Sequence, residues 1–345
     1  MANIALRNPQ YKNIVASASG SATPLSVSCK ITIDGTLRYT LIKNAPVLNS
    51  NVQFDIAELV RDYLNITYQS SYAIQTVAII TVLSTHQLIN GTGTVYDTTG
   101  NITDTGFEAY GTFDEGANPS VPFISVQSAE FLIAPNFSGN PDGTTPPKWQ
   151  IYYPTGKEGY VSYISQSGIT AVYNFNGNAT SQAGQGSLIC VIKRIDCTKY
   201  GVGTKIIFIN KYGVQQDLWF FLKETKQVNR TNENYKSNTI VYPTLGKAFY
   251  DIKNAPNKLF NTQAKQTLSL SSGYYPEQAN EMFQQLLMSE YVWLERPKNS
   301  NPSTNEIVPV IVKSSNIDFK TSVNDRLIEY TIEFENAFDY INNIR

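Results

Sequence analysis

The chain has 345 residues, of which 27 are Lys or Arg, 28 are Asp or Glu and one is His, so its formal net charge is −1. Charged residues make up 16% of the chain, below the roughly 25% of typical soluble domains. Hydrophobic residues at 41% and aromatic residues at 12% are enough for a folded core, which excludes intrinsic disorder. The near-zero charge disfavours non-specific nucleic-acid binding, and the single histidine, His86, excludes a metal site built from several histidines.

The length exceeds what one hydrophobic core usually serves, so two or three domains are expected. Residues 1–10 lack the apolar run of a signal peptide, which favours synthesis in the cytoplasm. The most apolar stretch, Tyr72 to Leu83, is too short to span a membrane and is rich in β-branched residues. It predicts a buried strand, and no membrane partner is expected.

The first part of the chain shows strand patterns at the spacing of a β-sandwich. Apolar residues alternate over 27–33 and 37–41 and flank Asp34-Gly35, a pair suited to a tight turn, so a β-hairpin is predicted. Residues 54–64 change to a helical period and predict one short helix. The polar run from Asn90 to Gly106 predicts the tip of a long hairpin or an exposed loop.

The middle third reads as strands almost throughout. The run from Asn136 to Pro147, rich in Gly and Pro, is the best candidate for a linker or projecting loop. Short strands joined by turns favour an antiparallel sandwich, because parallel strands need long crossovers. The predicted strands are 149–153, 160–164, 171–175, 187–192, 205–209 and 217–222.

The last third contains the one substantial helix that the sequence predicts, over residues 276–290. Pro276 suits its first turn, and a strand at 291–294 should follow. Two further strands are predicted at 307–313 and 326–335, and the second alternates polar and apolar residues, so one of its faces should be solvated.

These patterns predict a mainly β protein with two or three antiparallel β-sandwich domains, jelly-roll or immunoglobulin-like, and two short helices packed on them. Residues 1–135 form the expected N-terminal sandwich with its helix at 54–64. Residues 136–240 form a central sandwich, and residues 241–345 an α+β region with the helix 276–290.

No motif in the sequence predicts catalysis, a cofactor or a metal. A phosphate-binding Gly-rich loop and a nucleophile elbow are both absent, and Cys190 and Cys197 lack zinc-type spacing. Loop carboxylates could still meet in space, so a polysaccharide hydrolase is retained as a third hypothesis. Its candidate acids are Asp97, Asp104, Asp114 and Glu115.

The 22 tyrosines point to an interface, because a tyrosine buries a large ring while its hydroxyl keeps a polar partner. Large sheets also use tyrosine on half-exposed faces, so a purely structural interpretation stays open. A glycan- or receptor-binding surface around Trp149 and Tyr152 is the second functional hypothesis. The candidate interface residues are Tyr152, Tyr153, Tyr160, Tyr274 and Tyr275.

Three segments resemble proteins of one viral family. They are the block Lys205 to Phe221, the helix Glu277 to Glu290 with the following Tyr291-Val-Trp-Leu294, and the ending Leu327 to Glu335. Their hydrophobic spacing, with few charges and much Asn, Thr and Tyr, resembles the tail ring and hub proteins of crAss-like podoviruses, tailed phages that infect Bacteroidetes.

The resemblance implies a virion protein that is not an enzyme and needs no cofactor. It implies a homo-oligomeric ring in the tail or head-to-tail connector, stacked against the portal and other tail proteins. Genomic DNA that passes through the lumen without specific binding is a further partner that the resemblance leaves open. Identical subunits in a ring need two different contact patches, expected on the Asn90 to Gly106 and Asn136 to Pro147 loops and around the tyrosines.

Overall fold

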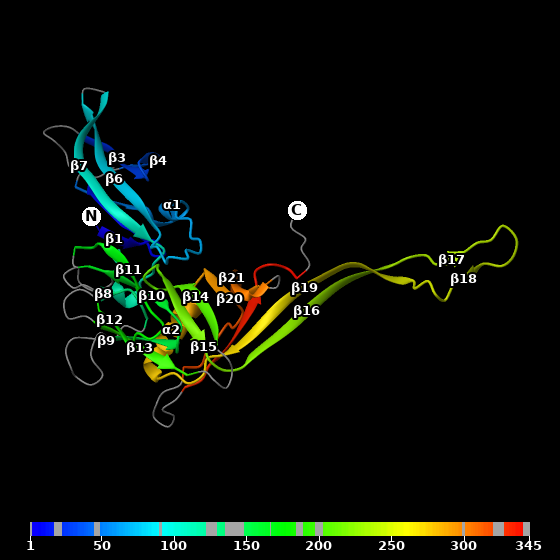
Figure 1. Ribbon diagram of the computed structural model, residues 1–345. Coiled ribbons are helices and arrows are strands. Elements are labelled where there is room, and N and C mark those ends of the chain that lie inside the picture. Colours follow the sequence, from blue (N-terminus) through cyan, green and yellow to red (C-terminus); the bar gives the residue numbers. More distant parts are fainter. Residues whose placement is uncertain are drawn as a thin grey trace.

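The computed structural model is mainly β, with several antiparallel sheets, which confirms the predicted fold class (Figure 1). Among the described residues no helix is both long and apolar enough to cross a membrane. The structure describes residues 2–16, 23–44, 49–89, 92–121, 130–134, 148–165, 167–183, 189–196, 203–298, 301–319 and 328–340.

The N-terminal part is a five-stranded sheet in the order β1-β7-β6-β3-β4. Asp34 and Gly35 join β3 to β4 with φ angles of 46° and 78°, the left-handed conformation that a tight hairpin turn requires, so the predicted hairpin is confirmed. A two-stranded sheet and the helix α1 adjoin it. The elements are β1 (Ala2–Ala5), β2 (Tyr11–Val15), β3 (Thr23–Ile33), β4 (Thr36–Asn44), β5 (Asn51–Asp55), α1 (Ala57–Arg61), β6 (Thr76–Ile89), β7 (Thr92–Phe107) and the 3-10 turn η1 (Phe113–Glu115).

Three boundaries in this part differ from the sequence-based expectations. The helix predicted over 54–64 is only α1, because residues 51–55 pair with β2 as β5. The predicted strand 72–83 begins four residues later, since Tyr72 occupies a turn with φ 57°. Within the run 90–106, residues 92–106 belong to the strand β7, which pairs with β6 as the second strand of a long hairpin, so the expected exposed loop is not found there. Asn90 and Gly91 lie outside the described residues.

The middle part consists of two three-stranded sheets that face each other. Edge-to-face ring pairs join them, with Tyr153 4.8 Å from Phe175 and Phe131 5.3 Å from Trp149. This packing is that of a small β-sandwich. The first sheet has the order β11-β10-β8 and the second β12-β13-β9. Their strands are β8 (Glu130–Phe131), β9 (Lys148–Pro154), β10 (Gly159–Ile164), β11 (Thr170–Phe175), β12 (Ser181–Ala183) and β13 (Ile189–Ile195).

Among the described strands two pairings are parallel, against the expectation of purely antiparallel sheets: β1 with β7, and β9 with β13. A parallel pair needs a long connection between its strands. Between β9 and β13 that connection is not a helix, because the intervening chain forms β10, β11 and β12.

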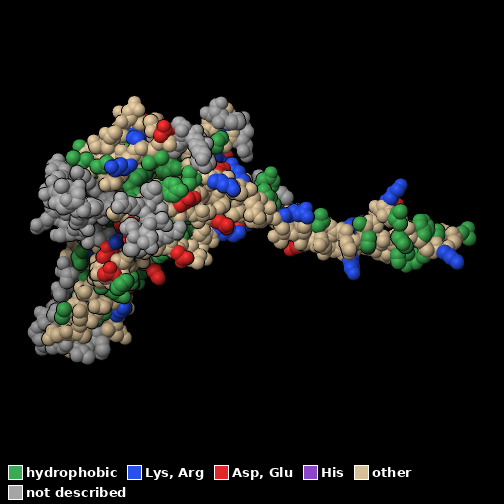
Figure 2. All heavy atoms as spheres, turned by 90° about the horizontal axis from the view of Figure 1, so that it is seen from below, with side chains coloured by type: hydrophobic (Ala, Val, Ile, Leu, Met, Phe, Trp, Pro, Cys, Tyr) green, Lys and Arg blue, Asp and Glu red, His purple; other side chains and the backbone are tan. Residues whose placement is uncertain are grey.

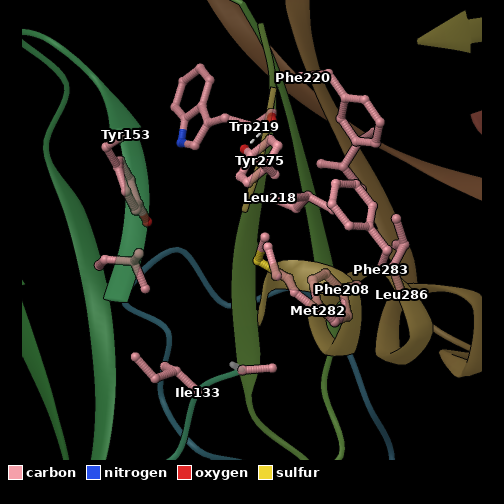
Figure 3. Close-up of a cluster of buried hydrophobic side chains, with 14 of the residues drawn as sticks. Ile133, Tyr153, Phe208, Leu218, Trp219, Phe220, Tyr275, Met282, Phe283 and Leu286 are labelled. Atoms are coloured by element: carbon pink, nitrogen blue, oxygen red, sulfur yellow. Dashed lines mark hydrogen bonds between the residues drawn. The ribbon is translucent and has the colours of Figure 1, made fainter. Parts of the chain in front are cut away.

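The C-terminal part is a seven-stranded sheet in the order β15-β14-β20-β21-β22-β19-β16. The helix α2 packs Met282, Phe283 and Leu286 against it, close to Phe208, Leu218 and Phe220 (Figure 3), and all six side chains are buried. The elements are β14 (Thr204–Ile209), β15 (Gln215–Phe220), β16 (Glu224–Lys236), β19 (Asn257–Ser271), η2 (Glu277–Ala279), α2 (Asn280–Met288), β20 (Val292–Lys298), β21 (Asn301–Val312) and β22 (Thr331–Asn336).

The predicted helix 276–290 is confirmed as η2 and α2, and the alternation predicted for the last strand is also found. Ile328, Tyr330, Ile332 and Phe334 are buried, whereas the residues between them are half-buried or exposed. The polar face of β22 is therefore the face directed away from the core.

The seven-stranded sheet extends across an expected domain boundary. The boundary at 240/241 falls at the far end of a ribbon formed by β16 and β19, and strands from both sides of it pair in this sheet. The boundary at 135/136 and the run Asn136 to Pro147 lie outside the described residues.

Polar contacts fasten the N-terminal part to the C-terminal part. The Arg61 guanidinium binds Glu108, in β7's connection to η1, and also Glu290, which follows α2, with 2.6 Å between Nη2 and the Glu290 carboxylate. Lys211 and Glu115 form a further ion pair at 2.5 Å. Together with Ile207, Ile209 and Trp293, which join the N-terminal core, these contacts make one body of the two parts.

Candidate functional site: the β16–β19 arm

The feature that sets this molecule apart is a two-stranded ribbon that leaves the body at the seven-stranded sheet (Figure 1). In it β16 and β19 pair antiparallel from Glu224 opposite Leu270 to Lys236 opposite Asn257. At roughly 3.3 Å per residue, β16 alone covers about 40 Å. Beyond it, β17 (Ile240–Val241) and β18 (Phe249–Tyr250) continue the ribbon to its far end. We call residues 224–271 the arm.

The half of the arm near the body, which we call the stem (residues 224–234 and 261–271), is polar where it leaves the body. Residues 224–234 of β16 read Glu-Thr-Lys-Gln-Val-Asn-Arg-Thr-Asn-Glu-Asn, in which Val228 is the one large apolar residue. Every residue of β16 except the half-buried Asn232 is exposed. Both faces of this strand are therefore compatible with water.

The far half, residues 235–260, is apolar, and we call it the head. Figure 2 shows green side chains gathered there and blue ones spaced along the arm. Ten large hydrophobic side chains of the head are 46 to 92% exposed. A continuous exposed patch of this kind marks an interaction site rather than ordinary surface. The ten are Tyr235, Ile240, Val241, Tyr242, Leu245, Phe249, Tyr250, Ile252, Leu259 and Phe260.

The head is apolar on both faces of its ribbon. Ile240 pairs with Tyr250, and Val241 pairs with Phe249. Cross-strand partners share a face, and consecutive residues of a strand alternate between faces. One face of the ribbon therefore presents Ile240 with Tyr250, and the opposite face presents Val241 with Phe249.

The charges of the chain are divided unevenly between the arm and the body. The arm carries seven Lys or Arg and three Asp or Glu, a net charge of +4. The other residues carry 20 Lys or Arg and 25 Asp or Glu, a net charge of −5. The chain's near-zero total thus conceals a basic arm on an acidic remainder.

A groove of about 830 Å³ lies at the root of the arm, lined by residues of β14, β16, β19, β20 and β22. Glu295 at its edge forms an ion pair with Lys205 at 2.5 Å and accepts a hydrogen bond from Asn305. Burial opposes ionisation of Glu295, but Lys205 and Asn305 outweigh it and lower the pKa of its carboxyl. A general acid needs a raised pKa, so Glu295 is not suited to that role.

Four of the five predicted interface tyrosines pack within the chain. Tyr153 and Tyr275 are 1% exposed, so they belong to the core and not to a surface. Tyr152 is half-buried with its ring 4.9 Å from that of Tyr275, and Tyr160 is half-buried and stacked on a neighbouring ring at 4.6 Å. Tyr274 is 59% exposed and alone of the five remains open to a partner.

The hydroxyls of two of the buried tyrosines converge on one carboxylate. Asp217 in β15 accepts a hydrogen bond from Tyr153 at 2.7 Å and another from Tyr72. The Lys205 ammonium lies 4.0 Å from the same carboxylate. Burial raises the pKa of both tyrosines well above the ordinary value, and the Asp217 charge adds to the effect. The hydroxyls stay protonated, so this cluster joins the three parts of the chain rather than performing acid–base chemistry.

Two of the candidate catalytic acids are held in ion pairs. Asp104 is buried in an ion pair with Lys12 at 2.5 Å, and Glu115 is paired with Lys211. Asp114 is exposed on η1, and the Asp97 side chain lies outside the described residues. Asp104 and Glu115 are thus each neutralised by a lysine, which disfavours a role as a catalytic acid pair.

The remaining chemical candidates are structural. His86 lies within β6, with Nε2 2.8 Å from the hydroxyl of Ser28, which is only 1% exposed and therefore inaccessible to a substrate. Cys29 and Cys190 are free thiols in the core, and Cys197 lies outside the described residues. Within the described part of the chain, no cluster of three His, Cys, Asp or Glu side chains could hold a metal ion.

Sequence patterns did not predict the arm, because a strand that is polar on both faces has no alternation to detect. A usable signal was present in the head. Its apolar residues are interrupted by Lys236, Lys247, Lys253 and Lys258, an arrangement unsuited to a buried strand. No protein-family model, curated protein or solved structure matches the chain, so the arm's own geometry and chemistry carry the functional proposal.

Proposed function

We propose that this chain is a structural protein of a phage virion. It acts as a ring or hub component of the tail or head-to-tail connector, through self-assembly and stacking on neighbouring rings. It is made in the host cytoplasm and resides in the virion tail. The observation that carries the proposal is the arm, whose head exposes apolar side chains on both faces far from the body.

An arm of this kind favours assembly over catalysis. A two-stranded ribbon is at best marginally stable in water, and its apolar head gains stability once a partner covers it. Two of the acids considered for hydrolysis, Asp104 and Glu115, are each held in an ion pair with a lysine. The surface considered for glycan binding is withdrawn from solvent, since Trp149 is 3% exposed and Tyr152 is half-buried.

Native mass spectrometry and electron microscopy of the purified chain, together with mass spectrometry of purified virions, test the proposal. We expect closed rings of one defined copy number and the chain among the virion proteins. A chain that is absent from every virion of the phage that encodes it would refute the virion role. Release of reducing sugars from host capsular polysaccharide by the purified chain would instead support the hydrolase hypothesis.

A further inference from the structure

The arm specifies how its partner must be shaped. A ribbon with one apolar face can lie flat on a single surface, but the head has Ile240 with Tyr250 on one face and Val241 with Phe249 on the other. Covering one face would leave the second in water. The partner must therefore enclose the head, either in a cleft or between two molecules.

The area available in the head matches that of a specific interface. Ten large side chains, each about half to nine-tenths exposed, offer on the order of 1,000 Å² of apolar surface, since each aromatic side chain alone can contribute roughly 150–250 Å². A standard protein–protein interface buries about 800 Å² on each partner. The head alone can supply one side of such a contact.

The net charges of the arm and the body favour a second copy of the same chain as the partner. The arm carries +4 and the remainder of the chain −5. Two arms repel each other, as do two bodies, whereas the arm of one copy and the body of another attract. An arm-to-body contact also uses two different surfaces of the same chain, which is the heterologous arrangement that a ring of identical subunits needs.

We propose that the head of each arm is enclosed by the bodies of neighbouring copies of the same chain. The apolar head supplies the buried area, the basic residues of the arm supply the attraction, and the polar stem bridges the distance between copies. This inference rests on the self-assembly of the proposed function and deepens it by naming the contact.

The arm offers well-matched variants for a test. Arg230 and Ala264 are cross-strand partners, so an Asn-Gly turn between them replaces residues 231–263 without altering the root. A second variant keeps the arm and removes its apolar character through Ile240→Thr, Val241→Thr, Phe249→Thr and Tyr250→Thr. The control is Val228→Thr, because Val228 is 52% exposed on the stem, outside the head.

Light scattering coupled to size-exclusion chromatography gives the readout. We expect the wild type and the Val228→Thr control to form the same oligomer. The shortened arm and the four-threonine head should remain monomeric, with association weakened at least about 100-fold. Equal assembly of the four-threonine variant and the wild type would overturn the inference while leaving the virion role in place.

Photocrosslinking identifies what touches the head. With p-benzoylphenylalanine in place of Phe249, we expect a product of twice the chain's mass, joined from the head of one copy to the body of another. A head-to-head product, or a product with a different virion protein, would overturn the inference. A wild type that is monomeric in solution yet present in virions would do the same, whereas its absence from virions would refute the proposed function itself.

Discussion

Asp217 shows how single residues join separate parts of this chain. Its carboxylate accepts hydrogen bonds from Tyr72, before β6, and from Tyr153, on β9, while Asp217 itself belongs to β15. From the sequence alone, every tyrosine is an equally good candidate for an interface. Only the burial of its side chain in the fold distinguishes a core tyrosine from an interface tyrosine. That burial depends on contacts between residues more than 60 positions apart, which no local pattern records.

Stability measurements can separate the core tyrosines from the exposed one. Tyr153→Phe should cost about 1 kcal/mol of unfolding free energy, because it removes one buried hydrogen bond. Asp217→Leu should cost about 3 kcal/mol, since it leaves two buried hydroxyls and Lys205 without their acceptor. Tyr274→Phe should stay within about 0.5 kcal/mol of the wild type. Urea unfolding gives all three values, and an equal loss for Tyr274→Phe would contradict the assignment.

Cys29 makes stability depend on alkaline pH. Burial raises the pKa of its thiol from the ordinary 9.0 to about 11, although Lys12 pulls it the other way. Because the folded pKa is the higher one, the stabilising contribution is complete below pH 9 and is lost between pH 9 and 11. We expect the stability advantage of the wild type over Cys29→Ala to shrink across that window. Urea midpoints measured at pH 8 and pH 11 check this, and a constant difference would count against it.

At the scale of elements, Arg61 at the end of α1 joins the N-terminal sheet to the segment after α2. Glu108, one of its partners, has a side chain that is 2% exposed, whereas Glu290, the other, is 49% exposed. Arg61→Ala should therefore cost about 2–3 kcal/mol of unfolding free energy, because it leaves the buried Glu108 carboxylate without its cationic partner. Glu290→Ala should cost less than about 1 kcal/mol, as exposed pairs do. Equal losses of unfolding free energy for Arg61→Ala and Glu290→Ala, measured by urea unfolding, would contradict the expectation that the buried ion pair contributes more than the exposed one.

Elements with local signals were predictable from the sequence, and elements defined by distant partners were not. Asp34-Gly35 dictates the β3–β4 turn by itself, and the helical spacing of Met282, Phe283 and Leu286 reveals α2. The parallel pairing of β9 with β13 has no local signal, because paired residues such as Trp149 and Cys190 lie far apart in the chain. The stem of the arm lacked one as well, since solvent covers both faces of β16.

At the scale of the whole molecule, the head of the arm should be more accessible to proteases than the body when the chain is free. Lys247 and Lys253 are exposed in the head, far from any core cluster. We expect trypsin to cut there before it cuts the body, and to cut these sites more slowly once the chain has assembled. Mass spectrometry of the timed digest identifies the first bonds cleaved. Cleavage of the head at one rate in monomer and oligomer would mean that the head remains open to solvent.

The continuity of β19 gives the arm a mechanical property. β19 is one strand from Asn257, at the head, to Ser271, at the root of the arm, where it pairs with β22 over five residues. A pull on the head therefore acts along the strand and perpendicular to the hydrogen bonds of that ladder. The bonds of a ladder pulled in this direction share the load, so tension on the head passes from β19 into β22.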